Sequence, residues 1–280
     1  MRILGLELSE KGVVGLIVVL ALVLMGVSAS LITFYRLDYL GKPFNPPNNE
    51  HILGTDDVGH DVFTYLVYGA RISFIVGFLT ALISTFTGLA VALLCYYDRL
   101  DLIVVRIIDL FMVIPRLPLL IVLSAIVKPS IWNIVLILSF FGWSITARVL
   151  RPMVRQLKCS NFIGILKVIG ARDHYILLRH VVPHLYSLIA VQFILEARHA
   201  ILAEAGVGFL GFEEPTTASW GMMLYHAFRN SYTFISNVWL WTTLPPALML
   251  ALLTLALTLI AVDLEENTIP CSGGFACDIG

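Results

Sequence analysis

The sequence predicts an all-α polytopic membrane protein with six transmembrane helices, for two reasons. The 280 residues are 59% hydrophobic and only 13% charged, and the mean hydropathy of +0.90 lies far from the balance of a soluble domain. The chain also holds four runs without Asp, Glu, Lys or Arg, of 24, 26, 19 and 33 residues, at residues 12–35, 72–97, 129–147 and 230–262. A helix needs about 20 apolar residues to cross a bilayer, so these runs alone predict four spans.

Residues 12–35 form the first run, and a short segment, residues 1–11, precedes it. Ser28, Ala29 and Ser30 resemble the small-residue cleavage site of a signal peptide. The run is nevertheless longer than the roughly 7–15 residues of a signal peptide's hydrophobic region. We therefore expect an uncleaved accessory anchor.

Residues 36–71 follow as an external loop that gathers Asp and His within the stretch LGTDDVGHD, residues 53–61. The spacing matches neither an EF-hand loop nor a zinc template, so no metal site is expected here. Turns and helix caps explain such residues better. Thr55 or Asp56 is the expected N-cap of the helix that enters the second span.

The remaining five spans are expected to form one core over residues 72–262, with a tail at residues 263–280. Two of these spans, residues 102–127 and 181–209, are interrupted by charged side chains. A long connection, residues 148–183, separates the fourth span from the fifth.

Lys and Arg residues are enriched in the cytoplasmic loops of membrane proteins. If the N-terminus is inside, the inner segments hold ten of these residues and the outer segments five. This bias predicts that both termini, and the connection at residues 148–183, are cytoplasmic.

Partners and bound groups are constrained by charge and by cysteine spacing. A net charge of −1 gives no sign of nucleic-acid binding. The four cysteines show no spacing typical of a disulfide framework or a metal site, so we expect free thiols at Cys95, Cys159, Cys271 and Cys277.

The connection at residues 148–183 keeps apolar residues at helical spacing among its basic ones. We expect two short amphipathic helices around Gly170, where glycine suits a left-handed turn. Asp173 is the expected N-cap of the second helix, and Pro183 is expected to open the next span. Two interpretations remain open for this pair: an interfacial pair resting on lipid headgroups, or a docking surface for a soluble partner.

Several motifs resemble one family. The 13-residue spacing from Gly170 to Pro183 is similar to the second half of the cytoplasmic coupling loop of ABC importer permeases. HILGTDDVGHDVFTYLVYGARIS (residues 51–73), Arg106-Ile-Ile-Asp109, LAEAGVGFLG (202–211) and EPTTASWGMML (214–224) resemble the C-type permease of dipeptide, oligopeptide and nickel importers. Two positions depart from the family pattern: Gly164-Ile165-Leu166 stands where the family has Glu-Ala-Ala, and His60 stands in place of an arginine.

The resemblance implies a transport subunit without its own ATP site. The sequence indeed contains no G-x-x-x-x-G-K-[ST] phosphate loop. By resemblance, ATP and Mg²⁺ would be bound by two separate cytoplasmic ATPase subunits, with a homologous second permease and an external solute-binding protein as further partners, all at a lipid bilayer. The implied coupling residues are Lys167, Gly170, Ala171, Asp173, Arg179, His180 and Pro183.

Charged residues inside the spans need partners or water, because each costs about 2.5–3.5 kcal/mol at a helix centre by insertion scales. Arg106 and Asp109 are three residues apart and are expected to form a structural pair, which the family also has. Arg116 and Glu196 lie roughly 21 and 22 Å along their spans from the same side, so they can meet at one level.

Two interpretations of the charged residues at this level of the membrane remain open. Arg116 and Glu196 could form a buried structural ion pair, or they could line a translocation path together with Arg198 and His199. Because residues two apart point about 200° apart on a helix, Glu196 and Arg198 cannot share one narrow face. Glu204 matches a family segment and is expected to be a structural or gating carboxylate.

A peptide would suit a mixed-charge path, while nickel and oligosaccharides remain alternative solutes. An ion-coupled secondary transporter is the other functional class; it often has an inverted repeat, and no repeat is found. A membrane-embedded enzyme would need an acid/base or metal constellation such as H-E-x-x-H, which the sequence lacks.

Overall fold

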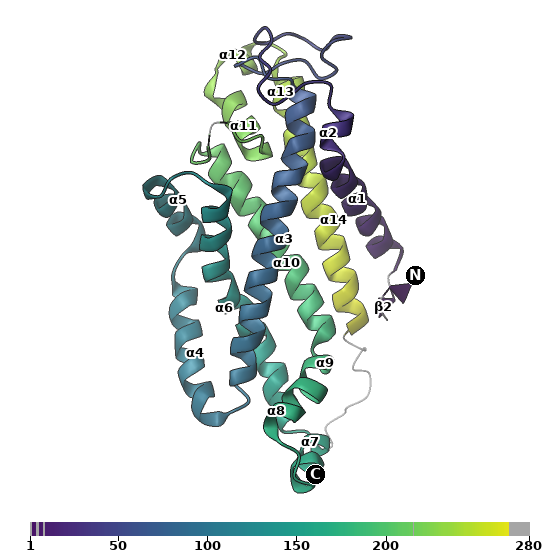
Figure 1. Cartoon of the computed structure of the whole chain (residues 1–280), viewed down its shortest axis with the longest axis vertical. Coiled ribbons are helices and arrows are strands. Elements are labelled where there is room, and N and C mark those ends of the chain that lie inside the picture. Colours follow the sequence, from purple (N-terminus) through teal and green to yellow (C-terminus); the bar gives the residue numbers. More distant parts are fainter. Residues whose placement is uncertain (1, 4–5, 8, 215, 269–280) are drawn as a thin grey trace.

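The computed structural model describes residues 2–3, 6–7, 9–214 and 216–268, and most of this part of the chain is helical (Figure 1). The all-α prediction is confirmed. One small addition precedes the first helix, an antiparallel pairing of β1 (Arg2–Ile3) with β2 (Leu6–Glu7). Cys271 and Cys277 lie outside the described residues.

Within the described residues, four helical segments are long and apolar enough to cross a membrane: α1 (Glu10–Val27), α3 (Val62–Leu94), α6 (Ile131–Lys158) and Trp239–Glu266, which covers α13 (Trp239–Thr242) and most of α14 (Leu244–Thr268). Two bent pairs also pass this test, which gives up to six spans. The bent pairs coincide with the two spans that charged side chains interrupt.

The first bent span joins α4 (Asp98–Val113) to α5 (Arg116–Ile126) at an angle of 71°. Its break has a local cause. Ile114 precedes a proline and takes an extended conformation with ψ 119°, which a helix cannot continue through. Arg116 therefore begins a new helix within the membrane.

The second bent span turns by 65° between residues 173–184 and α10 (Tyr186–Phe209). Its first part is built from α8 (Asp173–Ile176), a π-helical turn, η1 (Leu177–Val181), and α9 (Val182–His184). Pro183 was expected to open the span. It lies instead inside the short α9, and the straight helix begins three residues later, because the chain turns at Leu185.

Small residues let α3 pack closely between α6 and α10. A Cβ added at Gly77 would lie 2.8 Å from a side-chain carbon of Ile201 on α10, and one at Gly88 would lie 2.6 Å from Cβ of Thr146 on α6. Such close backbone approach is typical of helix packing in membranes.

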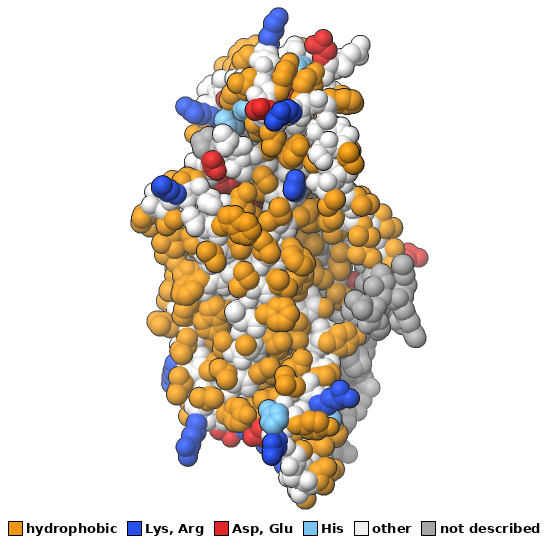
Figure 2. Space-filling model, in the orientation of Figure 1, with side chains coloured by type: hydrophobic (Ala, Val, Ile, Leu, Met, Phe, Trp, Pro, Cys, Tyr) orange, Lys and Arg blue, Asp and Glu red, His pale blue; other side chains and the backbone are white. Residues whose placement is uncertain are grey.

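The remaining elements gather at the two ends of the bundle (Figure 1). One end carries α7 (Asn161–Val168) and α8. The opposite end carries α11 (Trp220–Arg229), α12 (Tyr232–Ile235) and residues 33–61, and α2 (Ala29–Ile32) lies near it. Figure 2 shows hydrophobic side chains over the middle of the visible face and charged side chains towards both ends, the pattern expected of a membrane-embedded belt.

Asp61, not Thr55 or Asp56, caps α3. Its Oδ2 accepts hydrogen bonds from the backbone N–H and the hydroxyl of Thr64, at 2.9 and 2.7 Å. Asp56 instead accepts from the backbone N–H groups of Val58, Gly59 and His60, and so closes a turn. The expected kind of structure is therefore present, with the cap five residues later.

The N-terminal anchor packs against the bundle. Among the helices, α1 contacts α14 and α3, and the backbone N–H of Ser9 donates to Oδ2 of the buried Asp263 over 3.0 Å. The start of α1 therefore lies beside the end of α14, on one side of the bundle.

Candidate functional site

Two short helices, α7 and α8, flank Gly170, as predicted. Ser160 caps α7 by accepting from the N–H of Ile163, and Gly170 has φ +85°, a left-handed conformation that favours glycine. The predicted cap of the second helix is wrong by one position. Arg172 holds the extended N-cap conformation, and Asp173 is the first helical residue, where its charge still favours the positive helix start.

One face of this helix pair is anchored in the bundle and the other is open. Ile163, Ile176 and Leu177 are buried in a cluster with Leu150 of α6. Apolar side chains also cover the outward face, with exposed fractions of 64% to 88% at Ile165, Leu178, Ile169 and Val168. Exposed apolar side chains on an anchored element are typical of a docking surface.

Tyr96 joins this helix pair to the bundle, a role that its sequence position did not predict. It is 1% exposed and lies in the turn between α3 and α4. Its hydroxyl donates to Oδ1 of Asp173 over 3.4 Å, and Nζ of Lys167 lies 4.9 Å from the ring centre. Hydrogen bonding to Tyr96 raises the pKa of Lys167, so this lysine stays charged beside the ring.

A buried carboxylate locks α4 to α6 at the same end. Asp101 is 4% exposed and accepts two hydrogen bonds from Arg151, at 2.6 and 2.9 Å, and one from Arg155, at 2.7 Å. The sequence marked these arginines only as cytoplasmic charges. Their spacing of four residues, on one helix face, is the signal that could have indicated a shared partner.

Of the other predicted coupling residues, Ala171 lies between α7 and α8, Arg179 and His180 lie on η1, and Pro183 lies on α9. Ala171 packs against the buried cluster, whereas Arg179 is exposed. The ring of His180 lies between those of Phe162 and Tyr175, with ring centres 5.2 and 5.5 Å apart. His180 therefore contacts α7 through Phe162 and α8 through Tyr175.

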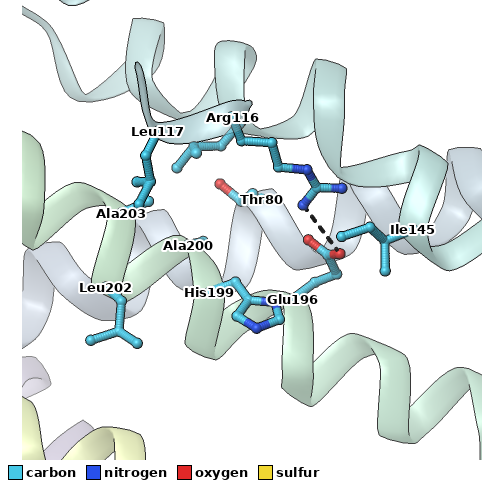
Figure 3. A pocket seen from close by; sticks show the side chains of 10 residues that line it. Thr80, Arg116, Leu117, Ile145, Glu196, His199, Ala200, Leu202 and Ala203 are labelled. Carbon is cyan, nitrogen blue, oxygen red and sulfur yellow. Dashed lines mark ion pairs between the residues drawn. The ribbon is translucent and has the colours of Figure 1, made fainter. Parts of the chain in front are cut away.

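The two intramembrane charges meet, as their depths predicted. Nη1 of Arg116, on α5, lies 3.7 Å from Oε1 of Glu196, on α10. Both line a cavity of about 350 Å³ between α3, α5, α6 and α10 (Figure 3). The other lining residues are mostly apolar: Thr80, Leu117, Leu138, Ile145, His199, Ala200, Leu202 and Ala203.

Arg198 does not line this cavity. It donates to the hydroxyl of Thr258 on α14 over 3.0 Å, and its Nη2 lies 3.1 Å from Nε2 of His199. The helical geometry that predicted opposite faces for Glu196 and Arg198 is confirmed. The cavity therefore holds Arg116, Glu196 and His199 of the four predicted path residues.

Glu204 lies outside the cavity and is fully buried. Its Oε2 accepts a hydrogen bond from Ser73 on α3 over 3.4 Å, and Glu213 lies against it. Glu213 in turn accepts from the Ser219 hydroxyl over 2.5 Å. Glu204 and Glu213 thus join α10 to the start of α11, and sequence reasoning missed the contribution of Glu213.

The expected pair of Arg106 with Asp109 is wrong. Within the described residues, Asp109 pairs with Arg148 of α6 at 3.5 Å, and no ion pair joins it to Arg106. The physical reason is that α6 packs against α4 and places Arg148 within reach of the carboxylate. Both partners are about half exposed, so this contact stabilises the fold little.

No resident metal centre emerges from residues 9–214 and 216–268, where no group of three or more His, Cys, Asp or Glu could hold an ion. A cavity at membrane depth is joined, through α3, α6 and α10, to an anchored helix pair with an open apolar face.

Comparison with known proteins agrees with this architecture. Residues 84–266 match the family model described as the inner membrane component of binding-protein-dependent transport systems. The dipeptide transport system permease protein of Alkalihalophilus pseudofirmus is 32% identical over 95% of this chain and 87% of its own length. The oligopeptide transport system permease protein of Bacillus subtilis is 32% identical over 77% of this chain and 72% of its own length.

A putative peptide transport system permease protein of Brucella suis is 31% identical over 90% of this chain and 85% of its own length. The family model covers the helix pair and most of the cavity-lining residues, and the relative from Alkalihalophilus pseudofirmus aligns with 95% of the chain. The chain therefore belongs to the family of inner-membrane components of binding-protein-dependent transport systems.

Proposed function

We propose that this chain is a permease subunit of an ATP-driven peptide importer, forms half of the translocation pathway, and couples to a separate ATPase through residues 164–183. The observation that carries the proposal is the helix pair α7–α8, which is anchored on one face and openly apolar on the other. A soluble partner is the occupant that such an exposed face favours.

Force applied to this helix pair has a direct route into the membrane. Gly170 sets the angle between the two helices, and Tyr96 holds Asp173 against the turn between α3 and α4. α3 in turn runs along the wall of the intramembrane cavity, where it contributes Thr80. Movement of a bound ATPase would therefore shift one wall of the path relative to the others.

The partners follow from this division of labour. We propose one homologous permease that completes the path, two cytoplasmic ATPase subunits that bind ATP and Mg²⁺, and an external solute-binding protein. That receptor would meet the end of the bundle with α11 and residues 33–61. Residues 1–11 and 263–280 would be cytoplasmic, 12–35 an accessory anchor, 36–71 external, and 72–262 the five-span core. The start of α1 beside the end of α14 supports termini on one side.

Peptides are the proposed solutes because the three relatives compared above are named as dipeptide, oligopeptide and peptide transport permeases. The cavity adds a physical reason. Its acidic and basic groups lie at one depth among apolar walls, a combination that suits a zwitterionic chain with uncharged side chains. Nickel is less favoured, because His199 is the only histidine among the residues that line the cavity.

The first test is co-purification of the tagged chain in mild detergent, followed by an ATPase assay of the assembly and uptake of a tripeptide in proteoliposomes. We expect a second permease and an ATPase to accompany the chain, and Asp173→Lys to release the ATPase while the chain stays in the membrane. His174→Gln, at an exposed neighbouring site, is the matched control. A chain that purifies alone and transports without ATP would refute the proposal.

A further inference from the structure

The contact between Arg116 and Glu196 is not a satisfied ion pair. At 3.7 Å, Nη1 and Oε1 are beyond hydrogen-bond distance. Arg116 instead donates through Nη2 to the backbone carbonyl of Phe141 over 2.8 Å. Oε1 of Glu196 therefore has no hydrogen-bond partner, although its side chain is only 3% exposed.

A second polar atom that lines the cavity also lacks a hydrogen-bond partner. The hydroxyl of Thr80 is buried and has no hydrogen-bond partner. Buried polar groups are nearly always hydrogen-bonded, and leaving one without a partner is costly. A purely structural ion pair would be expected to satisfy its own oxygens. Two polar groups without partners, one on α3 and one on α10, point to a hydrogen-bonding group that comes from outside the chain.

The size and lining of the cavity fit a small, partly apolar solute. Its volume of about 350 Å³ is within the range of small-molecule sites, and most of its walls are apolar. The start of α5 lies at the broken span, so its positive helix end stands beside Arg116. Broken membrane helices often supply the binding sites of transporters in this way.

We infer that this cavity binds the free amino terminus of a peptide in transit, with the ammonium group on Oε1 of Glu196 and the first carbonyl oxygen on Arg116. The inference rests on the proposed function, since it names the part of the solute that the path recognises. Thr80 would accept a further hydrogen bond from the ammonium group or from the first peptide N–H.

The chemistry matches at each group. The ammonium group of a peptide carries three hydrogen-bond donors, and the carbonyl group of its first residue is an acceptor close by. Glu196 and Arg116 offer the complementary acceptor and donor, and their side chains lie next to each other in the cavity (Figure 3). Leu117, Leu138 and Ile145 would surround the side chain of the peptide's first residue without selecting a particular residue type. The site would thus accept many peptides but distinguish a free amino terminus from a blocked one.

The test is ligand-observed saturation-transfer NMR on the full chain in lipid nanodiscs, with trialanine and N-acetyl-trialanine as probes. No receptor or ATPase is needed, so the result is separable from the proposed function. We expect a saturation-transfer signal from trialanine that is strongest at its first methyl group. Titrations should show that the acetylated peptide binds at least about tenfold more weakly, the loss expected when a charged hydrogen bond is removed.

Glu196→Gln keeps the shape and removes the charge, so it should weaken trialanine binding by a similar factor. Glu265→Gln, at an exposed position on α14, is the matched control and should bind as the unaltered chain does. Leu117→Trp fills the cavity from an exposed position and should abolish binding with Glu196 intact. Thermal unfolding of each variant reports whether it is folded.

Three results would overturn the inference: equal signals from both peptides, unchanged binding by Glu196→Gln, or no trialanine signal from the unaltered chain. A purely structural pair would give a different result. Glu196→Gln would then lose thermal stability but still distinguish trialanine from the acetylated peptide, and the double exchange of Arg116→Glu with Glu196→Arg would restore the stability. Peptide binding without any ATP-dependent uptake would leave the site standing and refute the proposed function instead.

Discussion

The Tyr96 hydroxyl donates a hydrogen bond to Oδ1 of Asp173 over 3.4 Å, between residues 77 positions apart in the chain. Tyr96 lies in the turn between α3 and α4, and Asp173 begins α8. This contact ties the predicted coupling surface to the membrane helix that forms one wall of the cavity. Removing this one hydroxyl group therefore tests whether movement of the helix pair is transmitted to α3.

Tyr96→Phe removes the hydroxyl and keeps the ring beside Lys167. We expect fewer peptides transported per ATP hydrolysed, by a few-fold, with the ATPase still bound, because the helix pair would move without pulling on α3. Transport and hydrolysis are measured together in proteoliposomes. The adjacent Tyr97→Phe, whose side chain is more exposed, is the control and should leave the ratio unchanged. A normal ratio in Tyr96→Phe would show that the contact does not transmit movement.

Gly170→Val should distort the angle between α7 and α8. A β-branched residue at φ +85° costs about 1–2 kcal/mol in backbone strain. Hydrogen exchange over residues 161–181 should become faster, and uptake should fall relative to ATP hydrolysis. Gly164→Ala is the matched control, because nothing lies within 4 Å of the added Cβ, and it should stabilise α7 by about 0.4–1 kcal/mol. Equal behaviour of the two variants would contradict the role of Gly170.

Asp101→Asn should destabilise the bundle, because the amide turns an N–H₂ group towards Arg151 and Arg155, which are about one-third exposed. We expect a loss of about 1–3 kcal/mol. Asp109→Asn removes a carboxylate from the same helix and should cost no more than about 1 kcal/mol, since that pair is about half exposed. Thermal unfolding in detergent measures both, and similar losses would refute the distinction.

A pH-dependent contact holds α11 to the loop at residues 33–61. Nδ1 of His226 lies 3.3 Å from Oδ1 of Asp57. The Asp57 carboxylate beside it raises the pKa of His226 above 6.5, although burial and Arg229 oppose the shift. A raised pKa in the folded state means that this contribution is fully present below pH 6.5 and is lost as the pH rises through the folded pKa.

The difference in unfolding temperature between the unaltered chain and His226→Gln should therefore shrink as the pH is raised from about 6 to about 9. His174→Gln, on the opposite end of the bundle, is the control and should show no such trend. A difference that stays constant with pH would mean that the charge of His226 does not hold this contact.

Cys159 offers a test of orientation, because it is exposed at the end of α6 next to the helix pair, whereas Cys95 is buried. With Cys271 and Cys277 replaced by serine, a membrane-impermeant maleimide should label Cys159 in inside-out vesicles only. Labelling of right-side-out vesicles would place α7 and α8 outside and reverse the predicted topology.

Predictions from the sequence were most accurate for features that depend on the residues within one helix or one short segment. Runs of apolar residues predicted the long helices, the spacing around Gly170 predicted the helix pair, and rise per residue predicted that Arg116 and Glu196 meet. It was weaker at helix starts. Asp61 caps α3 in place of Asp56, and Arg172 precedes α8 in place of Asp173, because several residues near each start can serve as caps and only the path of the loop selects one.

The sequence by itself determined the membrane class, the helical composition and the family resemblance. These properties depend on local composition and on short motifs along the chain. Tertiary structure alone decided which charges pair. Asp109 meets Arg148 and not Arg106, Asp101 binds two arginines, and Tyr96 reaches Asp173, because each contact joins helices whose relative rotation comes from packing. The same packing leaves Oε1 of Glu196 open in its cavity, which no spacing along the chain could have shown.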